Sequence, residues 1–187
     1  MRADALARRQ RIISAARELL TTMPDMASLE AVAKRAGVGI ATLYRNFPDR
    51  TSLLSTIVEE LFGQISALQT ETLANMPTEP AAAWEHYARG LIDLGLAPLA
   101  SSYTAEMVAN FHPDMVRLRD AVLSANDEII TLAQKSGQVS EHVTGAFFIR
   151  GLLSVARPHH KSVFHLDDEF TNTLVGVFLC GLKNFKS

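Results

Sequence analysis

Residues 28–47 read SLEAVAKRAGVGIATLYRNF, a pattern that indicates two short helices joined by a turn. Ser28 is a favourable residue for the start of a helix, and Gly37 ends that helix because glycine adopts a positive φ at little cost. A second short helix is expected over about residues 40–47, with Pro48 as its stop. Two short helices joined by a glycine-containing turn of about three or four residues form the helix-turn-helix, which places its second helix in the DNA major groove.

The two predicted helices have distinct inner and outer faces. The residues expected to face inward are apolar: Leu29, Val32, Ala33, Val38, Leu43 and Phe47. The outer face of the second helix carries Ile40, Ala41, Thr42, Tyr44, Arg45 and Asn46. The small residues at its start permit close approach to base edges, and the hydroxyls of Thr42 and Tyr44 suit phosphate oxygens. Arg45 suits guanine or phosphate, and the alternative for Tyr44 is a core aromatic beside Leu43.

Residues 36–50, AGVGIATLYRNFPDR, resemble the DNA-binding signature of the tetracycline-repressor (TetR) family. The resemblance extends over residues 6–60, and beyond them it is limited to helix count and apolar character. It implies an all-α fold with two domains. Residues 1–48 would form a three-helix helix-turn-helix domain, and residues 49–187 a helical bundle that binds a small-molecule effector and dimerises.

The resemblance also implies which residues contact DNA. They are Ser28, Leu29, Gly39, Ile40, Ala41, Thr42, Tyr44, Arg45 and Arg50. Ile40 and Ala41 would lie nearest the bases, whereas Ser28, Leu29 and Arg50 would meet flanking phosphates. Three arginines near the N-terminus would follow the backbone or the minor groove: Arg2, Arg8 and Arg9.

The charge of the chain is unevenly distributed. Residues 1–50 hold nine lysines and arginines against five acidic residues, a net charge of +4, whereas the remainder carries −6. A basic N-terminal region on an acidic body is typical of a DNA-reading domain with a separate regulatory domain. An enrichment of basic residues of this size also arises by chance, so the charge distribution agrees with a helix-turn-helix but does not identify one by itself.

Nearly all of the remaining chain is predicted to be helical, since apolar residues recur at positions i, i+3, i+4 and i+7 and no segment alternates with period two. Besides a first helix over residues 6–22, helices are expected over 49–75 and near 80–96, 98–111, 113–136, 140–157 and 168–185. The helix that starts at Asp49 has no linker before it. We therefore expect it to couple the DNA-reading domain to the body.

The last two predicted helices are apolar nearly all round, so each must be covered on two sides. One interpretation is a dimer interface formed by Phe148, Leu152, Val155, Leu174, Phe178 and Leu182. The alternative is that both are central helices of a single subunit. Four glycines are expected to allow close helix approach: Gly145, Gly151, Gly176 and Gly181. A dimer also suits DNA reading, since paired helix-turn-helix domains bind half-sites about 34–36 Å apart.

The resemblance implies an effector site in the body, and bulky or amphipathic residues are its candidates. They are Phe62, Trp84, Tyr87, Tyr103, Met107, Phe111, His112, Phe147 and Arg150. Each of them also suits ordinary core packing. Arg150, in an otherwise apolar helix, suits an anionic or polar ligand or a salt bridge between helices. A mainly aromatic pocket would take hydrophobic or planar molecules.

Other features bound the location and chemistry. Cys180 is the single cysteine, so no intrachain disulfide forms, and its apolar helix predicts a buried, inert thiol. The charged start is unlike a signal peptide, and no apolar run is long enough for a membrane span, so we expect a soluble cytoplasmic protein. His159, His160 and His165 admit a metal site, although their spacing is more typical of a solvated loop.

The sequence therefore predicts a TetR-type transcriptional regulator, most simply a repressor, that binds a palindromic operator as a homodimer and is released by a small effector. No phosphate-binding loop or nucleophile motif is present, so no enzyme activity and no cofactor are expected. The main alternative is an all-α ligand-binding protein or enzyme that carries a helix-turn-helix without operator specificity. A purely architectural DNA-binding protein would leave the acidic body unexplained, and an activator role stays open.

Overall fold

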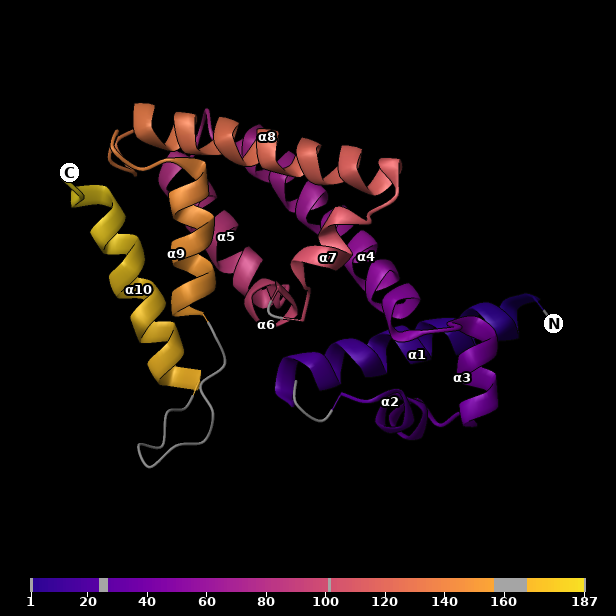
Figure 1. Cartoon of the computed structure of the whole chain (residues 1–187). Helices are drawn as coiled ribbons and strands as arrows, with labels where there is room; N and C mark the ends of the chain where they lie inside the picture. Colours follow the sequence, from indigo (N-terminus) through magenta and orange to yellow (C-terminus); the bar gives the residue numbers. More distant parts are fainter. Residues whose placement is uncertain (1, 24–26, 101, 157–167, 187) are drawn as a thin grey trace. The chain divides into compact units, whose positions relative to one another are not determined.

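The computed structural model describes residues 2–23, 27–100, 102–156 and 168–186, and in these residues all regular structure is helical (Figure 1). The expected all-α fold is thereby confirmed. The helices are α1 (Arg2–Thr22), α2 (Leu29–Ala36), α3 (Ile40–Asn46), α4 (Arg50–Asn75), α5 (Pro80–Asp93), α6 (Leu96–Ala100), α7 (Ala105–Ala109), α8 (Pro113–Lys135), α9 (Gly145–Val155) and α10 (Asp168–Asn184).

The chain divides into two compact units. Unit 1 comprises Met1–Glu60 and Pro98–Phe111, and unit 2 comprises Leu61–Ala97 and His112–Ser187. The sequence suggested a division between residues 48 and 49. In the structure the first turns of α4 belong with the helices before them, and a segment from the middle of the chain joins the same unit.

The core of unit 1 fixes the orientation of α3. Apolar side chains from four helices are buried together: Ile12, Ile13, Leu20, Val32, Ala33, Leu43, Phe47, Leu53, Leu54 and Ile57. Of the residues expected to face inward, Val32, Ala33, Leu43 and Phe47 are buried, and Leu29 and Val38 are half-buried. Because burial of one large apolar side chain contributes about 1.5–3 kcal/mol, Leu43 and Phe47 set which face of α3 is left outward.

The helix boundaries around the turn follow from local hydrogen bonds. Ser28 caps α2, since its Oγ accepts a hydrogen bond from the backbone N–H of Ala31 at 3.1 Å. Gly37 ends α2 with φ of 66°, in the left-handed region that favours glycine. The carboxylate of Asp49 accepts a hydrogen bond from the N–H of Ser52 at 2.7 Å and so caps the start of α4.

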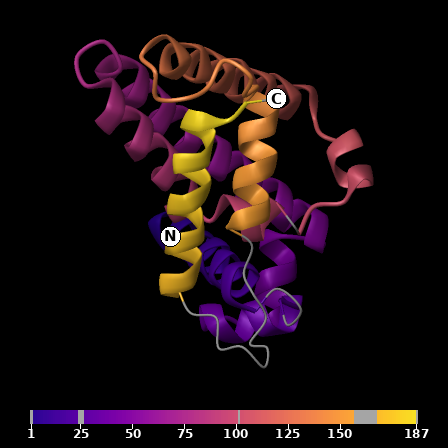
Figure 2. The same ribbon diagram turned by 90° about the vertical axis from the view of Figure 1, so that its left-hand side faces the viewer.

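Unit 2 is built from the later part of α4 and from α5, α8, α9 and α10. Its buried core includes Ile65, Trp84, Tyr87, Leu91, Ile129, Ile130, Ala133, Phe148 and Leu152. Helices α9 and α10 lie side by side, as Figures 1 and 2 show. Their contact continues into a small apolar cluster around Ala97, Ala156 and Val175.

Two predicted helices differ from the observed ones, and hydroxyl side chains explain both differences. The helix expected over 98–111 is replaced by α6 and α7, and Oγ1 of Thr104 accepts a hydrogen bond from the N–H of Met107 at 3.2 Å, which starts α7 separately. The helix expected over 140–157 begins only at Gly145, because Thr144 caps it through the N–H of Phe147 at 3.1 Å.

Candidate nucleic-acid interface

The outer face of α3 is accessible and carries side chains suited to DNA. Ile40 is 40% exposed and Tyr44 is 44% exposed, and Ala41 and Arg45 are also exposed. The buried Leu43 lies on the opposite face. The alternative placement of Tyr44 as a core aromatic is therefore wrong. An apolar residue, a small residue, a phenol and a guanidinium share one short accessible surface.

Thr42 organises the polar side chains at the end of α3. Its Oγ1 accepts a hydrogen bond from Nη2 of Arg45 at 2.9 Å, and its carbonyl oxygen accepts one from Nδ2 of Asn46 at 2.8 Å. The first bond lays the guanidinium along the helix. A guanidinium has several N–H donors in a planar fork, so Arg45 keeps donors for a base edge or a phosphate.

The flanking positions named from the sequence have structural roles of their own. The Ser28 side chain is exposed but already engaged in capping α2, and Leu29 is half-buried. Arg50 donates a hydrogen bond through Nη1 to the carbonyl oxygen of Ala27. This bond ties the start of α4 to the chain just before α2. Arg50 therefore has an internal partner in addition to any phosphate it meets.

Arg9 connects three helices. Its guanidinium carbon lies 5.0 Å from the centre of the Phe47 ring, and its Nη2 donates to Oγ1 of Thr56 at 3.2 Å. The arginine of α1 thus packs on the residue that ends α3 and binds the second turn of α4. Arg8 is exposed, whereas the side chain of Arg2 lies outside the described residues. Arg9 therefore holds α1, α3 and α4 together within unit 1, a structural role that its charge alone did not predict.

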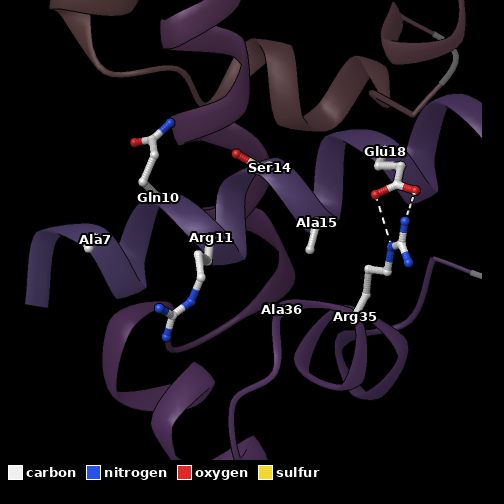
Figure 3. Close-up of a pocket in the computed structure, with 8 residues that line it drawn as sticks. All are labelled: Ala7, Gln10, Arg11, Ser14, Ala15, Glu18, Arg35 and Ala36. Atoms are coloured by element: carbon white, nitrogen blue, oxygen red, sulfur yellow. Dashed lines mark hydrogen bonds and ion pairs between the residues drawn. The ribbon is translucent and has the colours of Figure 1, made fainter. Parts of the chain in front are cut away.

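A shallow groove of about 430 Å³ lies between α1 and α2, away from the residues named above. Its lining consists of Ala7, Gln10, Arg11, Ser14, Ala15, Glu18, Arg35 and Ala36. Figure 3 shows Arg11 near one end and the ion pair of Glu18 with Arg35 at the other. Nε of Arg35 donates to Oε2 of Glu18 at 2.9 Å, and this hydrogen bond lowers the pKa of the Glu18 carboxyl. The pair joins α1 to α2 across an exposed surface.

In unit 2, two of the predicted effector-site residues meet in an aromatic cluster. The Trp84 ring centre lies 4.9 Å from that of Phe148 and 6.4 Å from that of Tyr87. The hydroxyl of Tyr87 donates to Oδ1 of Asn126 at 3.1 Å, and burial raises the pKa of Tyr87 to about 12. The phenol therefore stays protonated and acts as a donor.

Two polar residues of this cluster were missed at the sequence level. Gln69 is buried, and its Nε2 donates to the Tyr87 hydroxyl at 3.2 Å and to the carbonyl oxygen of Val122 at 2.9 Å. Asn126 is also buried. A signal for Gln69 was available, since it follows Ile65 by four residues on the apolar side of α4. A polar residue on such a stripe needs partners inside the fold.

The other effector-site candidates are spread over both units. Tyr103, Met107 and Phe111 belong to unit 1, and the remaining candidates lie in unit 2. Phe62 is half-buried, and Phe147 is 42% exposed with its ring centre 5.3 Å from that of Phe185. The remaining two, His112 and Arg150, are exposed.

Two of these side chains now have defined surroundings. His112 caps α8, because its Nδ1 accepts a hydrogen bond from the N–H of Asp114 at 3.3 Å. Arg150 makes no ion pair with the described residues, so the salt bridge considered from the sequence is not formed there.

The residues named for a dimer interface divide by burial. Phe148, Leu152 and Leu182 are buried within unit 2 itself. Val155, Leu174 and Phe178 are half-buried. The apolar surface that α9 and α10 leave open consists instead of Phe147, Phe170 and Val177, the last of which is 64% exposed.

The prediction of a buried Cys180 is wrong, since the thiol is exposed. Its helix is apolar on more sides than unit 2 covers, so residue type alone did not identify the buried side. The histidines considered for a metal, His159, His160 and His165, lie outside the described residues. Among the residues that the structure does describe, no group of side chains is arranged to hold a metal ion, and no helix has the length and apolarity to cross a membrane.

Comparison with known proteins agrees with the geometry of unit 1. Residues 12–57 match the family model of bacterial regulatory proteins, tetR family. The matched segment runs from Ile12 in α1 through α2 and α3 to Ile57 in α4. It thus contains both helices of the turn and the buried side chains that orient α3. No curated protein sequence matches the chain.

Solved structures of similar fold cover almost the whole chain. A TetR transcriptional regulator from Streptomyces coelicolor is 24% identical with a TM-score of 0.60, over 93% of this chain and 97% of the other. The TetR-like regulator LfrR from Mycobacterium smegmatis, solved with proflavine, is 20% identical with a TM-score of 0.70, over 97% of each chain.

A third similar structure is AibR, solved with isovaleryl coenzyme A and operator DNA. It is 15% identical with a TM-score of 0.55, over 91% of this chain and 97% of the other. The shared fold therefore includes the body as well as the N-terminal helices. Residues 12–57 thus match the tetR family of bacterial regulatory proteins, and along its length the chain has the fold of solved TetR regulators.

Proposed function

We propose that the protein is a transcriptional repressor that reads a palindromic operator with the outer face of α3. The observation that carries this proposal is the division of α3 into a buried face at Leu43 and an exposed face at Ile40, Tyr44 and Arg45. A helix of this length enters the major groove with its first residues against the base edges. A DNA-binding regulator acts where the chromosome lies, so the proposed location is the cytoplasm.

The proposed functional form is a homodimer. Unit 2 leaves Phe147, Phe170 and Val177 exposed on α9 and α10. Two glycines of α10, Gly176 and Gly181, have open space where a side chain would be, so a second backbone has room to approach there. A second copy on this surface would cover the apolar side chains and pair two α3 helices. Two helix-turn-helix domains would bind two half-sites, and the dimer would then make more DNA contacts than a single domain can.

We further propose that a small molecule binds the body and releases DNA. Support comes from the similar structures, since LfrR was solved with proflavine and AibR with isovaleryl coenzyme A and operator DNA. The aromatic cluster of Trp84, Tyr87 and Phe148 favours a planar or hydrophobic effector. For release, the effector must bind the released arrangement more tightly than the DNA-bound one, because only differential affinity shifts the equilibrium. The proposed role is regulation and includes no catalysis.

The proposal is tested by selecting bound fragments from genomic DNA with the full chain and then measuring mobility shifts on the selected sites. We expect enrichment of an inverted repeat whose half-site centres are about one helical turn apart, or a multiple of it. Scrambling one half-site should weaken binding strongly. Enrichment of no common sequence, with equal binding to scrambled DNA at every salt concentration, would leave only non-specific binding and refute the proposal.

A further inference from the structure

Unit 1 contains a segment that the helix-turn-helix does not explain. Residues 98–111 are grouped with Met1–Glu60, although the chain runs through unit 2 immediately before and after them. Leu99 is 1% exposed and Pro98 is buried. The match to the family model ends at residue 57, so this segment lies outside it. The DNA-reading unit thus includes a strap, residues 98–111, that is covalently joined to unit 2 at both ends.

One hydrogen bond joins the strap to α4. The hydroxyl of Tyr103 donates to the carbonyl oxygen of Leu54 at 3.0 Å in a partly buried setting, across 49 residues of sequence. Burial raises the pKa of the Tyr103 phenol well above its usual range, although the charge of Arg17 opposes that shift. The phenol is therefore protonated at any physiological pH. The bond is available in all conditions in which the protein works.

Local bonds hold the strap in shape around Tyr103. The backbone N–H of Ser102 donates a hydrogen bond to the carbonyl oxygen of Leu99 at 3.0 Å. The Ser102 hydroxyl donates a second one to the carbonyl oxygen of Pro98 at 3.4 Å. On the other side, Thr104 starts α7 through the N–H of Met107 at 3.2 Å. Tyr103 therefore stands between two locally bonded turns, and a displacement of the strap would move its hydroxyl.

The stretch of α4 that Tyr103 binds is the one that positions the DNA-reading helices. Arg50, four residues before Leu54, donates to the carbonyl oxygen of Ala27 at the entry to α2. Thr56, two residues after it, accepts the hydrogen bond of Arg9, whose guanidinium lies over the ring that ends α3. The first turns of α4 thus contact the start of α2 and, through Arg9, the end of α3. A displacement of the backbone at Leu54 would therefore occur close to both the Arg50–Ala27 and the Arg9–Thr56 hydrogen bonds.

We propose that Tyr103 is a positioning residue for operator binding, which holds the first turns of α4 in the DNA-reading arrangement through the carbonyl of Leu54. Tyr103 contacts no DNA itself in this scheme. Without its hydroxyl the free protein samples that arrangement less often, and the apparent operator affinity falls by the same factor. The inference rests on the proposed function and assigns Tyr103 to the DNA-reading unit, in place of the effector-contact role suggested by the sequence.

The test compares Tyr103→Phe with a matched control, Thr72→Val, in the full chain. Each variant keeps the shape of its side chain and loses one hydroxyl hydrogen bond to a backbone carbonyl of α4, but Thr72 donates to the carbonyl oxygen of Leu68 at 2.8 Å within unit 2. Fluorescence anisotropy on the wild-type operator, at a temperature where both variants are fully folded, should give about two- to tenfold weaker binding for Tyr103→Phe, the range expected of one hydrogen bond. Thr72→Val should bind as the wild type does.

Hydrogen exchange supplies a second readout that needs no operator. Amides of residues 50–60 and 98–111 should exchange faster in Tyr103→Phe than in Thr72→Val. Equal operator affinity of Tyr103→Phe and wild type, or equal loss in both variants, would overturn the inference, as would unchanged exchange in those segments. If the wild type itself binds no operator, the proposed function fails, and the exchange result still decides whether Tyr103 positions α4.

Discussion

At the scale of single residues, the arrangement of Thr42 and Arg45 defines which donors α3 would present to DNA in the proposed function. The bond of 2.9 Å between Arg45 Nη2 and Thr42 Oγ1 restricts the guanidinium before any ligand is present. A restricted side chain loses less conformational entropy on binding than a free one. Arg45 is therefore the residue of the exposed face for which a substitution should have the clearest effect.

We predict that Arg45→Ala weakens operator binding by about 1–3 kcal/mol, the usual range for an arginine bidentate to guanine. If Arg45 reads a base, the variant should also lose discrimination at one position of each half-site. If it binds a phosphate, the loss should be uniform over operator sequences and the salt dependence should become shallower. Arg89→Ala is the matched control, since Arg89 lies in unit 2 and pairs with Glu85 at 2.8 Å. Anisotropy titrations on an operator panel separate these outcomes, and an unchanged affinity would contradict the prediction.

How far the sequence predicts single residues depends on whether a periodic pattern constrains them. The burial of Leu43 and Phe47 and the exposure of Tyr44 follow from the period of a short amphipathic helix. Gln69 and Asn126 could not be assigned, because their partners come from helices remote in sequence. Arg9 was expected at DNA, whereas its contacts with Phe47 and Thr56 depend on how α1, α3 and α4 pack.

At the scale of helices, one glycine sets how closely α9 and α10 approach. A Cβ at Gly151 would lie 2.4 Å from Cζ of Phe178. Real Cβ atoms do not approach ring carbons so closely, so a side chain there must push α10 or rotate the ring. A Cβ at Gly63 in α4 would meet no atom within 4 Å. Alanine substitutions at the two positions therefore separate two effects on stability. At Gly151 the added methyl group meets a neighbouring helix, whereas at Gly63 only the helix propensity of the residue changes.

We predict opposite effects on stability for alanine at these two positions. Gly151→Ala should lower the free energy of unfolding by about 1–3 kcal/mol, as overpacking does. Gly63→Ala should raise it by about 0.5–1 kcal/mol, because alanine loses less backbone entropy in a helix interior. Urea unfolding of both variants measures the difference. A stabilising effect of Gly151→Ala would show that α9 and α10 do not pack as described.

Helix order followed from the sequence, while the division of one helix, the start of another and the buried face of a third did not. The expected helix over 98–111 is divided because the Thr104 hydroxyl offers the backbone an alternative partner and Tyr103 is bound to α4. The thiol of Cys180 was expected to be buried, since α10 is apolar nearly all round. For such a helix, sequence does not identify which side its own subunit covers.

At the scale of the whole molecule, the proposed function assigns DNA reading to unit 1 and effector binding and dimerisation to unit 2. The net charge is +4 over the first 50 residues and −6 over the rest, so electrostatic attraction to DNA would be strongest in the first part of the chain. The proposed homodimer would join two such parts through unit 2. Exposed Phe147, Phe170 and Val177 are the side chains that this association would cover.

The most direct test of DNA reading by a dimer is a titration of the full chain against the selected operator and a scrambled duplex over a range of salt concentrations, with complex mass measured by sedimentation. We predict two chains per operator, a preference for the operator of at least about 10³-fold, and a linear fall of log K with log salt as phosphate contacts release counterions. A single chain per duplex, or equal affinity for both duplexes at every salt concentration, would contradict the account.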